Sequence, residues 1–212
     1  MKAIPLFSLE LRRLLLSRLT WLIALLTLLS PLAGLTLYKP ASAGTMLSMY
    51  LANPALAGGA AGGVLFGLLA VFELDRANRC RVDVLVDAAV SPLRMALVRL
   101  LALMSAAALT LCLAMLVWLP VSRGLIGAVF DGAEYLLAYA LFMGLALPLG
   151  ILAASSAYQF ARRADLSLVA LAVFAGLSLS VWADDWQLCW LNPCVWALSD
   201  DFSNFRIFRS VA

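Results

Sequence analysis

The residues best able to do chemistry lie in one polar stretch, residues 73–92, between two long apolar runs. Arg79, Asp83 and Asp87 recur every fourth residue, so they share one face of a helix. An apolar stripe with helical spacing covers the other face and consists of Val82, Leu85, Val86, Ala89 and Val90. The pattern predicts a short amphipathic helix with one charged and one apolar face.

The length of this stretch favours a docking role. Ser91 and Pro92 end the predicted helix, because a proline disfavours helix at the preceding residue and can open the next helix. A simple connector needs only about five residues, whereas this one has 20 and contains a helix. We therefore predict a surface on which a soluble partner docks. The alternative is a solvated loop that follows the membrane surface.

The rest of the sequence offers no catalytic chemistry. It has no histidine, so a zinc or haem site built on histidine is excluded. The motifs GxxxxGK[ST], HExxH and GxSxG are missing, and the only lysines are Lys2 and Lys39. We expect no catalytic residue, cofactor, metal or nucleic-acid partner. Cys189 and Cys194 could form a disulfide or remain unpaired.

The elements that must position these residues are apolar and long. Hydrophobic residues make up 65% of the 212 residues, and charged residues 13%. A bilayer core of ~30 Å takes about 20 residues of helix. Five stretches are predicted to span it: Trp21–Tyr38, Ala55–Phe72, Met95–Leu119, Tyr135–Ala154 and Leu166–Trp182. The predicted fold is an all-α, polytopic membrane protein with residues 1–212 as one transmembrane domain.

The glycines predict how these spans pack, and the charged residues predict how they are oriented in the membrane. The second span carries small residues at the i, i+4 spacing of close helix–helix contacts, and we predict a packing face of Gly58, Gly59, Gly62, Gly63 and Gly67. Charged residues are absent from the middle of every expected span, so the chain shows no ion-coupling site of its own. Most arginines precede the first span or lie between the second and third and the fourth and fifth, which places the N-terminus in the cytoplasm.

Before the first span, residues 4–19 have an apolar side with Leu9 and Leu14 and a charged side with Glu10 and Arg13. This pattern predicts an elbow helix, within residues 1–20, that lies in the membrane interface with its arginines toward the headgroups. Residues 184–212 would form an outer segment.

Three features together resemble the membrane subunits of bacterial type-2 ABC exporters. They are the amphipathic N-terminal helix, the polar stretch FELDRANRCRVDVLVDAAVSPLRMALVRLLA, and an apolar outer segment with LNP. The resemblance implies a bacterial inner-membrane permease subunit. Its partners would be cytoplasmic ATP-binding subunits and a second permease subunit, as a homodimer or heterodimer. It also implies that residues 73–92 are a coupling region in which the ATPase contacts Glu73, Arg76, Arg79, Asp83, Leu85, Val86 and Asp87.

The chain departs from this family in one respect. The family has six spans, and the sequence shows five. We expect a sixth span beyond Ala212, although residues 186–198 could instead make an incomplete, re-entrant return into the bilayer. A competing interpretation of the whole chain is a membrane scaffold that transports nothing and recruits a soluble cytoplasmic protein.

Overall fold

The computed structural model describes residues 3–36, 48–79 and 91–178, and this part of the chain is all α-helical. Four helical stretches are long and apolar enough to cross a membrane: Arg18–Leu35, Tyr50–Arg76, Pro92–Ile126 and Gly132–Ala161. They coincide with the first four predicted spans. The fifth predicted span begins with α9 (Ala164–Ser178), an apolar helix of 15 residues. At 1.5 Å per residue these cover about 22 Å, which is less than a bilayer core of ~30 Å.

Three of the four long stretches are built from several helical segments. The first consists of α2 (Arg18–Leu29) and α3 (Pro31–Thr36), and the break falls at the proline, which lacks a backbone donor. The second consists of the π-helical turn η1 (Ser48–Ala52) and α4 (Asn53–Arg79). The fourth consists of α7 (Gly132–Ala138), the π-helical turn η3 (Tyr139–Met143) and α8 (Gly144–Ala161).

The third stretch, α6 (Pro92–Ile126), is one continuous helix of 35 residues. It begins after Ser91, as the proline signal predicts. Its length of about 52 Å exceeds a bilayer core of ~30 Å by several turns. Part of α6 therefore extends beyond the hydrocarbon, and Arg94 and Arg99 lie in its first turns.

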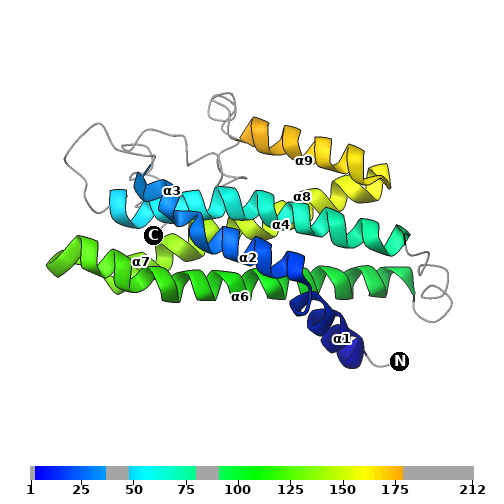
Figure 1. Ribbon diagram of the computed structural model, residues 1–212, viewed down its shortest axis with the longest axis horizontal. Coiled ribbons are helices and arrows are strands. Elements are labelled where there is room, and N and C mark those ends of the chain that lie inside the picture. The colour runs from blue at the N-terminus through cyan, green and yellow to red at the C-terminus, as the bar shows by residue number, and fades with distance from the viewer. Residues whose placement is uncertain (1–2, 37–47, 80–90, 179–212) are drawn as a thin grey trace.

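The long helices run side by side (Figure 1). The ends that carry most of the described arginines meet at one end of the bundle, where α4 ends, α6 begins and α8 turns into α9. Helix α1 (Ala3–Leu15) projects from this same basic end (Figure 1). Arg123, Asp131 and Glu134 lie toward the opposite end, and Asp131 caps α7 by accepting a hydrogen bond from Ala133 N at 2.8 Å.

The first part of the predicted polar stretch continues the helix of the second span. Residues 73–79 form the last turns of α4, so this helix ends about two turns later than the hydropathy of the sequence suggested. Residues 80–90, which include Asp83, Leu85, Val86 and Asp87, lie outside the described residues. So do residues 184–212, with the predicted outer segment and Cys189 and Cys194.

Candidate functional site

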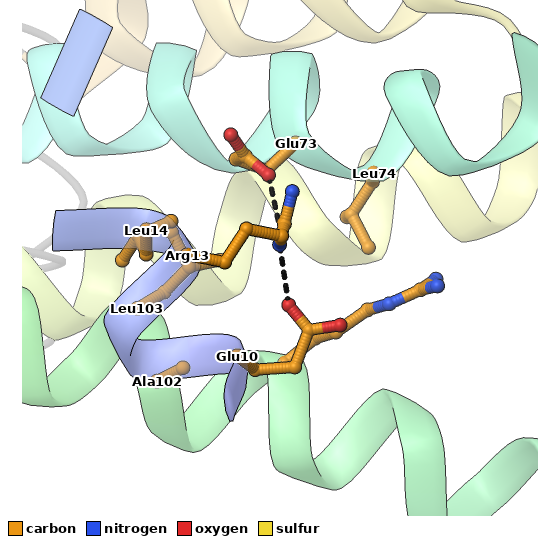
Figure 2. A pocket seen from close by; sticks show the side chains of 8 residues that line it. Glu10, Arg13, Leu14, Glu73, Leu74, Ala102 and Leu103 are labelled. Carbon is orange, nitrogen blue, oxygen red and sulfur yellow. Dashed lines mark hydrogen bonds and ion pairs between the residues drawn. The ribbon is translucent and has the colours of Figure 1, made fainter. Parts of the chain in front are cut away.

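The main polar cluster in the described part of the chain lies at the basic end, where α1 meets α4 and α6. Arg13 of α1 is its centre (Figure 2). Its Nε lies 2.7 Å from Glu10 Oε2, three residues earlier on α1, and its Nη2 lies 2.7 Å from Glu73 Oε2 on α4. Arg76 Nη1 approaches the other oxygen of Glu73 at 3.9 Å. The ion pairs therefore tie the N-terminal helix to the second span.

This cluster is sheltered by apolar side chains. Leu14, Leu74, Ala102 and Leu103 surround the crevice that holds the ion pairs, and Arg99 also lines it. Glu73 is only 8% exposed. The crevice has a volume of about 10 Å³, which is room for roughly one water molecule. Because its residues come from α1, α4 and α6, the cluster is a junction between helices.

The charges in the junction stabilise one another. Burial on its own lowers the pKa of Arg13, but its hydrogen bond with Glu10 and the negative charges of Glu73 and Glu10 outweigh burial and raise that pKa. Arg13 therefore stays cationic at any physiological pH. A buried carboxylate such as Glu73 needs this partner, because an unpaired buried charge is costly.

The junction turns one arginine of the N-terminal helix toward protein, whereas Arg12 stays on the exposed side. Arg13, which was expected to face lipid headgroups, points to α4, and Leu14 beside it is buried. Leu9 and Leu16 are 62% and 73% exposed on the outer side, where Arg12 is also exposed. Exposed leucines on this side are the residues that an interfacial helix would bury in a membrane surface.

Two further contacts fix this end of the bundle. The indole Nε1 of Trp21 donates to the carbonyl of Leu15 at 2.7 Å, so it satisfies one of the last carbonyls of α1 at the corner with α2. The hydroxyl of Tyr158, near the end of α8, donates to Asp75 Oδ1 at 3.3 Å. The last turns of α4 are thus tied to α1 on one side and to α8 on the other.

The glycines of the second span lie where α4 meets its neighbours. A Cβ on Gly59 would come within 2.6 Å of the Phe142 carbonyl oxygen, and one on Gly63 within 2.8 Å of the Ala146 carbonyl oxygen. Gly150 of α8 approaches the backbone of Gly63 closely in return. The α4 and α8 backbones are therefore in direct contact, and because both numberings rise together the two helices are parallel.

The other three glycines contact side chains of several elements. Gly58 adjoins Pro31 of α3 and Met143, Gly62 adjoins Thr27 of α2 and Leu147, and Gly67 adjoins Leu171 of α9. These are the small-residue contacts by which helices associate in lipid.

Of the predicted partner contacts, Glu73 is buried in the junction and Arg76 is exposed beside it. Arg79 ends α4. Sequence analysis predicts a charged face with Glu10 and Arg13 but does not connect these residues to Glu73. The sequence feature that could have revealed the Arg13–Glu73 pair is an acidic residue near the end of a span in a chain that begins with a short basic helix.

The fold and hydropathy define the chain as a multi-pass α-helical membrane protein. Comparisons with protein-family models, with curated proteins and with solved structures find no match.

Proposed function

We propose that this protein is the permease subunit of an ATP-driven ABC exporter in a bacterial inner membrane, with its N-terminus and the segment 80–90 in the cytoplasm. The substrate would move outward by alternating access, and separate cytoplasmic subunits would hydrolyse ATP. A second permease subunit, identical or different, would complete the path. The basic end of the bundle supports this orientation, because arginines are enriched on the cytoplasmic side of membrane proteins.

The main support for the proposal is the two interactions that hold the last turns of α4. Glu73 is held by Arg13 of α1, and Asp75 accepts a hydrogen bond from Tyr158 of α8. These turns are the first part of the predicted coupling region, residues 73–92, and the rest of that region follows directly in the sequence. A force applied to that region would therefore reach α1, α4 and α8 together. A transporter needs such a connection between its ATPase contact and its spans.

The first experiment asks for the partner. The tagged chain is purified from its native membrane in mild detergent, and vanadate-sensitive ATP hydrolysis is measured in the eluate. We expect a nucleotide-binding subunit and its activity to copurify. An eluate that contains the intact chain and no ATP hydrolysis would contradict the exporter function.

A matched pair of variants locates the contact. Leu85→Asp places a charge on the apolar face of the predicted coupling helix and should remove the ATPase, because apolar residues at the centre of an interface carry most of its binding energy. Leu93→Asp makes the same change at a residue that is 72% exposed at the start of α6, and it should retain the partner. Equal retention by both variants would show that the helix is an ordinary connector.

A membrane scaffold that recruits a soluble protein is the competing function. The junction is compatible with it, because ion pairs that tie α1 to α4 can give static support as well as transmit force. A scaffold would retain its soluble partner without any ATP hydrolysis in the eluate. The same purification therefore separates the two functions.

A further inference from the structure

Several buried polar side chains of the described spans have no hydrogen-bond partner. They include the hydroxyls of Thr20 and Thr27 and the amide Nδ2 of Asn53. Thr27 is fully buried, and the other two are 4% exposed. An unsatisfied polar group inside a bilayer is unfavourable, because neither water nor lipid tails supply a partner. We therefore consider what could supply a hydrogen-bond partner to these two hydroxyls and this amide.

Other hydroxyls of this protein do find partners. Thr110 donates to the carbonyl of Ala106 at 2.9 Å, and Ser105 and Ser167 make the same bond to the carbonyl four residues earlier. This local bond is the usual solution for a serine or threonine in a membrane helix. Thr27 lies inside a regular helix and does not make it.

Two of these side chains lie on one face of α2, and Asn53 begins α4, the helix against which α2 and α3 pack. Thr20 and Thr27 are seven residues apart, so they lie on the same face of α2. The methyl group of Thr27 would lie 2.9 Å from a Cβ on Gly62 of α4. Gly34 of α3 adjoins the backbone of Asn53 at the start of α4. We call this contact of α2 and α3 with α4 the threonine seam.

The other face of α4 is different. Its contact with α8 is made by backbone against backbone, at Gly59, Gly63 and Gly150. A Cβ added at any of these three glycines would clash with the backbone of the other helix. Around Thr27 the threonine seam is made by side chains instead, since a Cβ on Gly62 would meet the Thr27 methyl group, and among the described glycines of the seam backbone meets backbone only at Gly34.

We propose that the threonine seam opens during the transport cycle and admits an uncharged, hydrogen-bonding part of the cargo, which binds Thr20, Thr27 and Asn53. This inference rests on the proposed exporter function. The cargo portion is uncharged because the described residues of the seam between Thr20 and Gly34 carry no charge, and an ion in hydrocarbon needs a charged or strongly polar partner. Hydroxyl and amide groups on the protein match hydroxyl, ether or amide groups on the cargo.

The first test measures access to the seam in native membranes supplied with ATP. Cys80, Cys189 and Cys194 are replaced by serine, and Cys112, which is exposed on α6, remains as the lipid-facing control. Thr27→Cys is then compared with Thr110→Cys. The probe is 2-hydroxyethyl methanethiosulfonate, which is small, uncharged and hydroxyl-bearing.

We expect Thr27→Cys to react at least about tenfold faster than Thr110→Cys and Cys112, because only a thiol that meets water forms the reactive thiolate. A cationic reagent of similar size, 2-(trimethylammonium)ethyl methanethiosulfonate, should react much more slowly at position 27. Equal rates at positions 27 and 110 would overturn the opening of the seam. Equal rates of the two reagents at position 27 would overturn the uncharged cargo.

The second test separates binding from packing. Thr27→Val removes a hydroxyl that has no partner, so the thermal midpoint of the purified protein should not fall. Thr110→Val removes a bonded hydroxyl and should lower the midpoint by about 2–4 °C. A fall for Thr27→Val as large as that for Thr110→Val would show a hidden structural bond and overturn the proposal.

The tests of the seam and of the exporter function can fail separately. Labelling at position 27 without a copurifying ATPase would show that the seam opens, but it would remove the exporter function and with it the cargo. A copurifying ATPase with an unreactive position 27 would support the exporter function and overturn the opening of the seam.

Discussion

Replacing Arg13 by alanine should destabilise the protein by leaving Glu73 without its closest partner. Glu73 is 8% exposed and its carboxylate lies 2.7 Å from the Arg13 guanidinium. Loss of one member of a fully buried ion pair costs about 3–5 kcal/mol. The Arg13 side chain is 33% exposed, which adds solvent screening, and Arg76 remains 3.9 Å from Glu73. We therefore expect a loss of roughly 1.5–3 kcal/mol.

The assay is thermal unfolding of the purified protein in detergent, followed by tryptophan fluorescence. For a chain of this length, 1 kcal/mol corresponds to about 2–4 °C, so Arg13→Ala should lower the midpoint by about 3–12 °C. Arg12→Ala is the matched control, because Arg12 lies on the exposed side of the same helix. A surface change of that kind should stay within about 0.5 kcal/mol.

A double-mutant cycle shows whether the loss belongs to the pair. Glu73→Gln removes the buried charge, so adding Arg13→Ala to it should cost less than Arg13→Ala alone, by at least about 1 kcal/mol. Two observations would refute the reasoning. One is equal midpoints for Arg13→Ala and Arg12→Ala, and the other is strict additivity of the Arg13 and Glu73 changes.

Three further outcomes are expected. Gly63→Ala should lower stability by about 1–3 kcal/mol in the same unfolding assay, because its Cβ would meet the Ala146 carbonyl oxygen at 2.8 Å. Gly124→Ala has no atom within 4 Å of the new Cβ and should be neutral or slightly stabilising. Equal effects of the two changes would contradict the close α4–α8 contact. Trp118→Phe should cost about 1–2 kcal/mol, because the indole Nε1 donates to the Leu28 carbonyl at 2.8 Å and that carbonyl would lose its side-chain donor; an unchanged midpoint would argue against this bond. Cys80 should react with an impermeant thiol reagent only after cells are permeabilised, and labelling in intact cells would reverse the proposed orientation.

The sequence by itself determined the class of protein and much of its helical structure. Hydropathy and length are local properties, so four membrane-length helices could be placed without any knowledge of their neighbours. Pro92 marked the start of α6 for the same local reason, since a proline fits the first turn of a helix. The predicted end of the second span at Phe72 was early, because polar residues after it continue the helix to Arg79.

Only the tertiary structure decided which faces of these helices meet. The alternation of leucines and charged residues in α1 is the same whether its arginines face headgroups or protein. Its orientation depends on Glu73, which lies 60 residues further along the chain and reaches Arg13 only when α1 packs against α4 and α6. Likewise, the composition of α2 shows two threonines in an apolar helix, but not that both are buried without a partner. Burial and pairing are relations between distant segments, and in a membrane hydrophobicity alone does not distinguish a face in contact with lipid from one in contact with protein.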